Sequence, residues 1–210
     1  MVSSAKPISH PIRLVLWVVL SFVVAQVIGW TVDPTQGLYL FYACFVLAVF
    51  VPHWRQQAYP FWRYFALAEW GFVGLGLVGL LGIFVFFEWL GSLLPIPQFR
   101  TSSAVLLAQY QASPLLFGLL SCGLAPLFEE WLFRGVLLHQ WAESRSAWRA
   151  IVGTSLLFGI LHLSYPLHAF GMALILGWIA LRLQTWWPTW LIHLIWNSCL
   201  LLGMNKGLFA

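Results

Sequence analysis

Charged residues are scarce in this chain. Its 210 residues include ten Lys and Arg and six Asp and Glu, so that only 8% are charged, whereas an ordinary globular domain has about 25%. So few charges do not cover a water-exposed surface, which excludes a soluble enzyme, a disordered chain and a fibrous protein. A hydrophobic fraction of 61% and a mean hydropathy of +0.87 instead predict a single polytopic integral membrane domain over residues 1–210.

The chain also lacks the residue clusters that several other functions require. Its basic residues are scattered singly, which excludes a phosphate-binding patch, and so a nucleic-acid partner, in spite of a net charge of +4. Cys44, Cys122 and Cys199 lie far apart in apolar stretches and match no zinc or redox spacing. Asp33 is the only aspartate, and this excludes a protease that works with two intramembrane aspartates.

Long apolar runs predict an all-α membrane bundle of about seven or eight transmembrane helices, because each crossing needs roughly 20 apolar residues. We expect spans at residues 12–31, 37–51, 64–90, 113–139, 150–163, 167–181 and 188–204. The third run is long enough to split, which would give an eighth span. Residues 95–112 form the longest polar loop, and we expect them to act as a lid or a partner surface.

The charge distribution predicts the orientation of the chain in the lipid bilayer. The apolar run that follows Lys6 and Arg13 lacks a small-residue cleavage site, so we expect a retained anchor. With the N-terminus in the cytoplasm, seven basic residues fall in cytoplasmic segments and only two outside, as the positive-inside rule requires. The short chain with few soluble loops is typical of a bacterial plasma membrane or an organellar membrane.

Ionisable side chains at membrane depth cost several kcal/mol and mark functional sites. Five of them lie at depth in the predicted spans, away from the span ends, together with one polar neighbour: Glu129, Glu130, Arg134, His162, His193 and the neighbour Asn197.

Helix geometry separates the two adjacent glutamates. Residues four apart share a helix face, whereas neighbours point about 100° apart. Glu130 and Arg134 are therefore expected to form an ion pair, and Glu129 points elsewhere without that partner. A carboxylate so placed suits a general base. The alternative is an architectural ion pair beside a spare glutamate.

Histidines complete the pattern in two later spans. His193 and Asn197 are also four apart, so they can present two hydrogen-bond donors to one point, as an oxyanion requires. The alternatives are a helix-packing pair for these two residues and a purely structural role for His162. By their depth, Glu129, His162 and His193 could line one cavity that opens to the cytoplasm.

Together the three motifs resemble the signature of the CPBP intramembrane proteases, the group of CAAX prenyl endopeptidases and bacteriocin-processing or immunity proteins. That signature reads E-E-x-x-x-R, then F-x-x-x-H, then H-x-x-x-N or D. Here it stands complete and in order as Glu129-Glu130…Arg134, Phe158…His162 and His193…Asn197. The resemblance covers residues 113–205, the motif-bearing core.

This resemblance implies hydrolysis of a peptide bond in a membrane-associated or lipidated peptide or protein. Glu129 and His162 would activate a water molecule, His193 and Asn197 would form the oxyanion hole, and Glu130 and Arg134 would support the site. Members of the family are often labelled metalloproteases, and Glu129, His162 and His193 are the residues that could hold zinc with a water. No H-E-x-x-H pair is present, and we favour metal-free water activation without a cofactor.

Three alternative functions stay open at this point. Ser121 could form a dyad with a histidine, but it lacks the Gly-x-Ser-x-Gly turn of serine hydrolases. A non-catalytic binding or immunity protein could keep the same fold. A proton-coupled transporter could use the glutamates and histidines as a relay, although the chain has no detectable repeat.

Overall fold

The computed structural model describes residues 9–31, 40, 43–44, 67–94, 110–111, 113–144, 146–162 and 165–206. Regular structure in these residues is helical, without a strand, which confirms the predicted all-α class. The chain divides into two compact units, Met1–Gln56 and Gln57–Ala210. The first contains α1 (Ser9–Thr31), which matches the first expected span. The span expected at 37–51 and the loop at 95–112 lie almost wholly outside the described residues.

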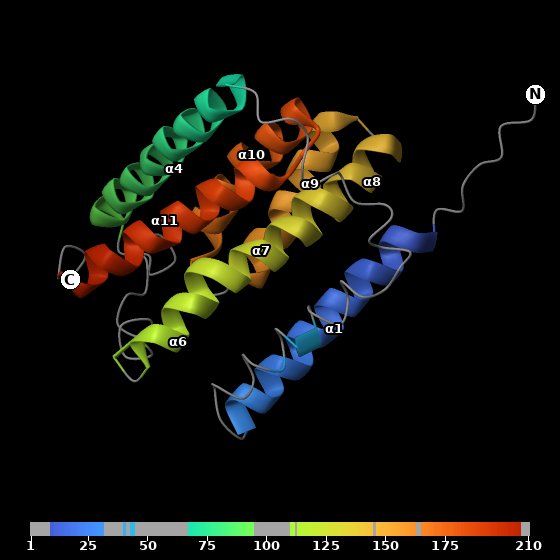
Figure 1. The fold of residues 1–210 in the computed structure, drawn as a ribbon. Helices are drawn as coiled ribbons and strands as arrows, with labels where there is room; N and C mark the ends of the chain where they lie inside the picture. The colour runs from blue at the N-terminus through green and yellow to red at the C-terminus, as the bar shows by residue number, and fades with distance from the viewer. Residues whose placement is uncertain are drawn as a thin grey trace, which may run out of the picture. The chain divides into compact units, whose positions relative to one another are not determined.

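The second unit contains the helices that carry the three motifs (Figure 1). Helix α4 (Leu67–Leu93) is one helix over its 27 residues, so the described part of the third expected span does not split. The later helices are α9 (Ala147–Leu161), α10 (Pro166–Leu183) and α11 (Trp187–Asn205). Their bounds lie within a few residues of the expected fifth, sixth and seventh spans.

The fourth expected span is a continuous helix of 31 residues, Pro114–Ser144. It consists of α6 (Pro114–Gly118), the π-helical η2 (Leu119–Leu124), α7 (Ala125–Glu130), the π-helical η3 (Trp131–Leu137) and α8 (Leu138–Ser144). Pro126, which has no N–H to donate, is the second residue after the first π segment. Such wide turns are frequent at functional sites, and here the second one begins directly after the two motif glutamates.

Three of the described helices are long and apolar enough to cross a membrane: Glu69–Leu93, Pro114–Ser144 and Pro166–Leu183. Helix α9, with 15 residues, extends only about 22 Å, which is shorter than a hydrocarbon core of about 30 Å. The described residues therefore support a helical membrane protein but do not confirm a count of seven or eight spans.

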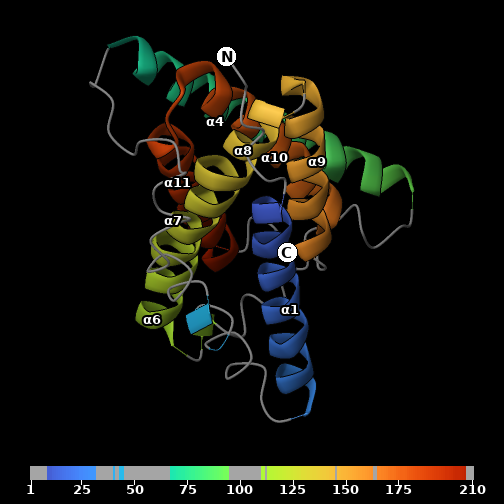
Figure 2. The same ribbon diagram turned by 90° about the vertical axis from the view of Figure 1, so that its right-hand side faces the viewer.

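Helix α10 is the centre of the second unit. It packs along α9 on one side and along α4 on another (Figure 2). It also contacts α11 and η3. Half of the most apolar window of α10 is buried, compared with 17% for α4. The outward face of α4 carries large exposed apolar side chains, among them Leu75, Val78, Leu81 and Val85. An apolar face of this size suits contact with lipid.

Glycines let α4 approach its neighbours closely. A Cβ on Gly76 would lie 2.5 Å from Cδ1 of Ile192 and 3.0 Å from Cδ1 of Ile179, and both isoleucines are fully buried. Gly74, two residues earlier, has no atom within 4 Å of the same position and is exposed. Gly76 therefore serves close helix packing, and Gly74 does not.

We predict that Gly76→Leu destabilises the protein and that Gly74→Leu does not. A leucine at 76 must displace two buried isoleucines, and overpacking of this kind costs about 1–3 kcal/mol. Thermal unfolding of the two variants in the same detergent measures the difference. Equal midpoints for Gly76→Leu and wild type would show that the packing between α4 and its neighbours is looser than described.

Candidate functional site

The buried carboxylate of Glu130 links two helices at the centre of the site. Glu130 is the last residue of α7 and is fully buried. Its Oε1 accepts a hydrogen bond of 2.8 Å from Nη1 of Arg134, one turn further on, as the four-residue spacing predicted. The same oxygen also accepts a bond of 2.9 Å from Nδ1 of His193 on α11. The ion pair therefore also fixes a histidine that lies 63 residues away in the sequence.

The ring of Phe158 packs against the polar residues of the site. Phe158 is fully buried on α9. Its ring lies 4.6 Å from Cζ of Arg134 and stacks on the ring of His162 at 4.2 Å, so it contributes both a cation–π contact and a stacking surface. The ring of His193 lies at 6.2 Å, edge to face. The aromatic residue of the second motif thus contacts residues from all three motifs.

His162 lies just beyond the last turn of α9. Its φ of −99° and ψ of 64° are not helical. Nδ1 lies 2.8 Å from the carbonyl oxygen of Phe158, and because a carbonyl only accepts, Nδ1 carries the proton and donates. In the neutral ring Nε2 therefore has the lone pair. The same reasoning applies to His193, whose Nδ1 donates to the Glu130 carboxylate.

Both histidines direct Nε2 toward the same carboxylate oxygen. Oε2 of Glu129 lies 3.9 Å from Nε2 of His162 and 3.9 Å from Nε2 of His193. These distances are too long for direct hydrogen bonds, and they are short enough for one small molecule to bond to more than one of the three atoms. Only 13% of the Glu129 side chain is exposed, and 17% and 3% of the two histidines. The structure therefore brings one carboxylate oxygen and two imidazole nitrogens together in a nearly buried place.

Asn197 lies one turn beyond His193 and connects α11 to η2. Its Nδ2 donates a hydrogen bond of 2.9 Å to the carbonyl oxygen of Ser121. An amide nitrogen carries two hydrogens, so this bond engages one of them. Ser121 contributes its backbone oxygen to this contact, and no described contact joins its hydroxyl to a histidine. The assignment of His193 and Asn197 to an oxyanion hole stays a prediction.

The donor atoms of Glu129, His162 and His193 are of the types that zinc binds, but their spacing is wide. A tetrahedral zinc with bonds of 2.0–2.1 Å holds its ligand atoms about 3.3 Å apart, compared with the 3.9 Å measured from Glu129 to each histidine. In the described parts of the chain no group of three or more His, Cys, Asp or Glu side chains is arranged to hold a metal ion. The donor types are therefore those of a zinc site, while both measured separations are wider than a bound zinc requires, and the reaction proposed for the site uses no metal.

Two further contacts involve residues to which the sequence assigns no role: His168 with Glu88, and Tyr165 with His162. His168 on α10 is 8% exposed, and its Nε2 lies 3.6 Å from Oε1 of Glu88 on α4. Each residue alone lies near a span end, so only the packing of α4 on α10 reveals the pair. Tyr165 precedes α10, and its ring lies 5.4 Å from that of His162. The available signal for Tyr165 was its position three residues after the motif histidine.

The fold and the site define a helical membrane protein with a nearly buried glutamate–histidine centre. Residues 111–199 match a family model described as type II CAAX prenyl endopeptidase Rce1-like. This match is consistent with a CPBP family protease, confirms the resemblance predicted from the three motifs and covers all of them. It supports an integral membrane protein of the CAAX endopeptidase type and leaves the metalloprotease label unconfirmed. Searches of curated proteins and of solved structures each found no significant match.

We predict that Arg134→Ala lowers both stability and activity. The fully buried Glu130 carboxylate would lose its cation, and breaking one partner of a buried ion pair costs about 3–5 kcal/mol. Thermal unfolding and the yield of monodisperse protein in detergent measure the loss. As the matched control, Glu130→Gln with Arg134→Met removes both charges and should recover much of the stability. An Arg134→Ala variant that melts with wild type would contradict the energetic role of the pair.

Proposed function

We propose that the protein is an intramembrane endopeptidase that hydrolyses a peptide bond with a water molecule activated by Glu129 and His162. The observation that carries this proposal is the convergence of Oε2 of Glu129 on Nε2 of both histidines at 3.9 Å. A water oxygen about 2.8 Å from Oε2 and from Nε2 of His162 satisfies ordinary hydrogen-bond geometry. The proposal uses only residues that the structure already brings together.

In the first step the water oxygen bonds to the carbonyl carbon of the substrate and its proton passes to Glu129. Nε2 of His162, with Nδ1 bonded to the Phe158 carbonyl, accepts a hydrogen bond from the second O–H of the water and so orients it, and that hydrogen stays on the water oxygen. The carbonyl double bond opens, and the negative charge moves to its oxygen. When the intermediate collapses, the C–N bond breaks, and the amine leaves with the proton that Glu129 took up.

His193 and Asn197 would stabilise the oxyanion. Because Nδ1 of His193 donates to Glu130, only the imidazolium form has a proton on Nε2 to donate. With His193 in that form, the group of Glu129, Glu130, Arg134 and His193 has no net charge, which lowers the cost of holding it at membrane depth. The second amide hydrogen of Asn197 is the other donor. Each such donor is worth about 10²–10³ in rate.

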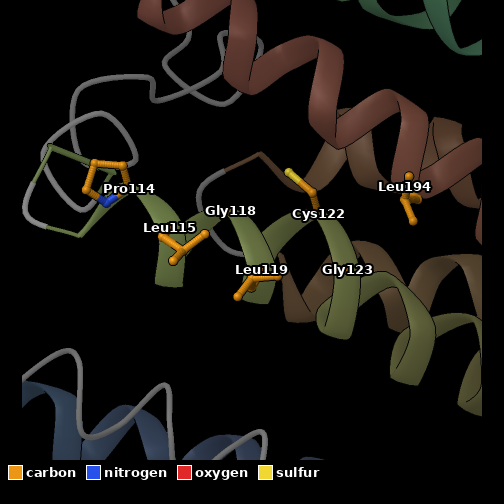
Figure 3. A pocket seen from close by; sticks show the side chains of 7 residues that line it. All are labelled: Pro114, Leu115, Gly118, Leu119, Cys122, Gly123 and Leu194. Carbon is orange, nitrogen blue, oxygen red and sulfur yellow. The ribbon is translucent and has the colours of Figure 1, made fainter.

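An apolar groove beside the site is the observation that favours a lipidated substrate. It encloses about 360 Å³ and is lined from α6 and η2 by Pro114, Leu115, Gly118, Leu119, Cys122 and Gly123, and from α11 by Leu194 (Figure 3). Cys122 directly follows Ser121, whose carbonyl binds Asn197, and Leu194 directly follows His193. The lining carries no charge. We propose that it takes the hydrocarbon chain of the substrate while the peptide lies over the histidines.

The charge distribution and the short soluble loops of the sequence favour one orientation and one kind of membrane. We infer that the N-terminus and the site face the cytoplasm, in a bacterial plasma membrane or an organellar membrane. A substrate would then approach from the lipid bilayer and the cytoplasmic surface together.

We predict that Glu129→Gln lowers the rate of peptide cleavage by at least about 100-fold, because a general base contributes 10²–10⁴ in rate, while the protein remains folded. Purified protein in detergent is incubated with a quenched library of short lipidated and unlipidated peptides. The matched control is Glu143→Gln, which changes an exposed glutamate on α8 and should leave the rate unchanged. Wild-type-like cleavage by Glu129→Gln would refute the mechanism.

The same assay separates this proposal from its alternatives. Cleavage that persists with a zinc chelator supports metal-free activation, and cleavage that a chelator abolishes and zinc restores would replace it with a metal-dependent reaction. Failure of the wild-type protein to cleave any library peptide would favour the non-catalytic binding or immunity protein.

We predict that Gly123→Leu slows cleavage of lipidated peptides and spares unlipidated ones. A Cβ on Gly123 meets no atom within 4 Å, so the larger side chain fills the groove without a clash. Gly82→Leu is the control, because Gly82 is a helical glycine that likewise has no atom within 4 Å of its Cβ position and lies on α4, outside the groove. An equal loss on both peptide classes would argue against the groove as the lipid site.

A further inference from the structure

The end of α9 does not by itself fix the orientation of the His162 ring. The residue lies beyond the helical part of α9, with non-helical φ and ψ angles, so its side chain is not held by the rigid turn that positions a residue within a helix. Its Nδ1 bond to Phe158 fixes one atom but permits the ring to tilt about that contact. The water-activating atom, Nε2, lies on the far side of the ring. A small tilt therefore changes its distance from Glu129.

Tyr165 supplies a second contact with this ring. The ring of Phe158 stacks on His162 with an interplanar angle of 25°, and the ring of Tyr165 contacts it at 5.4 Å with an angle of 54°. The two aromatic rings thus come from different elements, α9 and the residue that precedes α10. The backbone N–H of Tyr165 also donates a 3.0 Å hydrogen bond to the carbonyl oxygen of His162. Ring and backbone of the histidine are both tied to Tyr165.

The start of α10 holds Tyr165 in this place. The carbonyl oxygen of Tyr165 accepts the N–H of Ala169 at 3.1 Å, which anchors the tyrosine to the first turn of α10. A Cβ on Gly159 would lie 2.8 Å from the carbonyl oxygen of Pro166 and 3.0 Å from Cβ of Phe170. The glycine therefore permits the close approach of α9 to the start of α10 that brings Tyr165 onto His162.

We propose that Tyr165 is a positioning residue that holds the His162 ring, through aromatic contact, with Nε2 directed at Glu129. This inference rests on the proposed function for its consequence in catalysis. Burial raises the pKa of the Tyr165 hydroxyl, and the nearby Glu129 carboxylate raises it further, so the tyrosine stays neutral and adds no charge to the site. The ring of Tyr165, and not its hydroxyl, therefore orients His162.

Three variants separate the ring from the hydroxyl and from general stability. Tyr165→Phe keeps the ring and should leave kcat within about twofold of wild type. Tyr165→Leu removes the ring and should lower kcat at least about tenfold with KM little changed, since displacing a reacting group by about 1 Å can cost 10²-fold. The matched control is Phe72→Leu, which removes a ring contact of 5.7 Å to Trp178 between α4 and α10 and should leave kcat unchanged.

Two kinetic results would overturn the proposal. If Tyr165→Leu keeps the wild-type kcat, the aromatic contact does not position His162. If Tyr165→Phe loses as much as Tyr165→Leu, the hydroxyl is responsible and not the ring. A fall in thermal midpoint shared by Tyr165→Leu and Phe72→Leu, with a loss of kcat in the first alone, supports positioning over a merely structural contribution.

A second readout does not depend on peptidase activity. In protein labelled with ¹⁵N-histidine, the His162 signal is assigned by its loss in His162→Gln. Wild type and Tyr165→Phe should show one tautomer with the proton on Nδ1, and Tyr165→Leu should show a mixture of tautomers. An unchanged His162 signal in Tyr165→Leu overturns the positioning role even when no substrate is known. Absence of cleavage by wild type with the expected change in signal would instead refute only the proposed function.

Discussion

The carboxylate of Glu130 is the constraint on which the rest of the site depends. A fully buried negative charge is costly, so it requires partners wherever the chain folds around it. Arg134 supplies the positive charge from the same helix, and His193 supplies a second hydrogen bond from α11. Because one oxygen accepts both bonds, the electrostatic need of a single residue sets the register of α11 against the helix of the first motif.

From that register follows the chemistry of the two histidines. Each has its Nδ1 hydrogen engaged, by a carboxylate in His193 and by a backbone carbonyl in His162, so that each presents Nε2 to Glu129. A hydrogen bond made by one ring nitrogen sets which of the two nitrogens carries the proton. The reactive geometry is thus produced by hydrogen bonds on the far side of each ring, and aromatic packing by Phe158 and Tyr165 completes it.

The membrane explains why this centre is concentrated in one part of the fold. Helix α4 exposes a broad apolar face, and α10, packed between α9 and α4, is the most buried of the three long apolar helices. Polar groups are tolerated only where other polar groups of the bundle satisfy them. The wide π turns around the first motif belong to the one long helix that carries both glutamates, which places irregular backbone next to the site and away from the outward face of α4.

The sequence by itself determined the helical membrane class, the bounds of most described helices to within a few residues, and the pairing of Glu130 with Arg134. All three depend on composition or on spacing within one helix, which are local properties. The sequence did not determine the count of spans, because α9 is short and its role as a crossing depends on its surroundings. Only the tertiary structure decided that His193 binds Glu130, that Asn197 binds Ser121, and that Tyr165 contacts His162. Those contacts depend on the rotation and close approach of separate helices, which no spacing along the chain encodes.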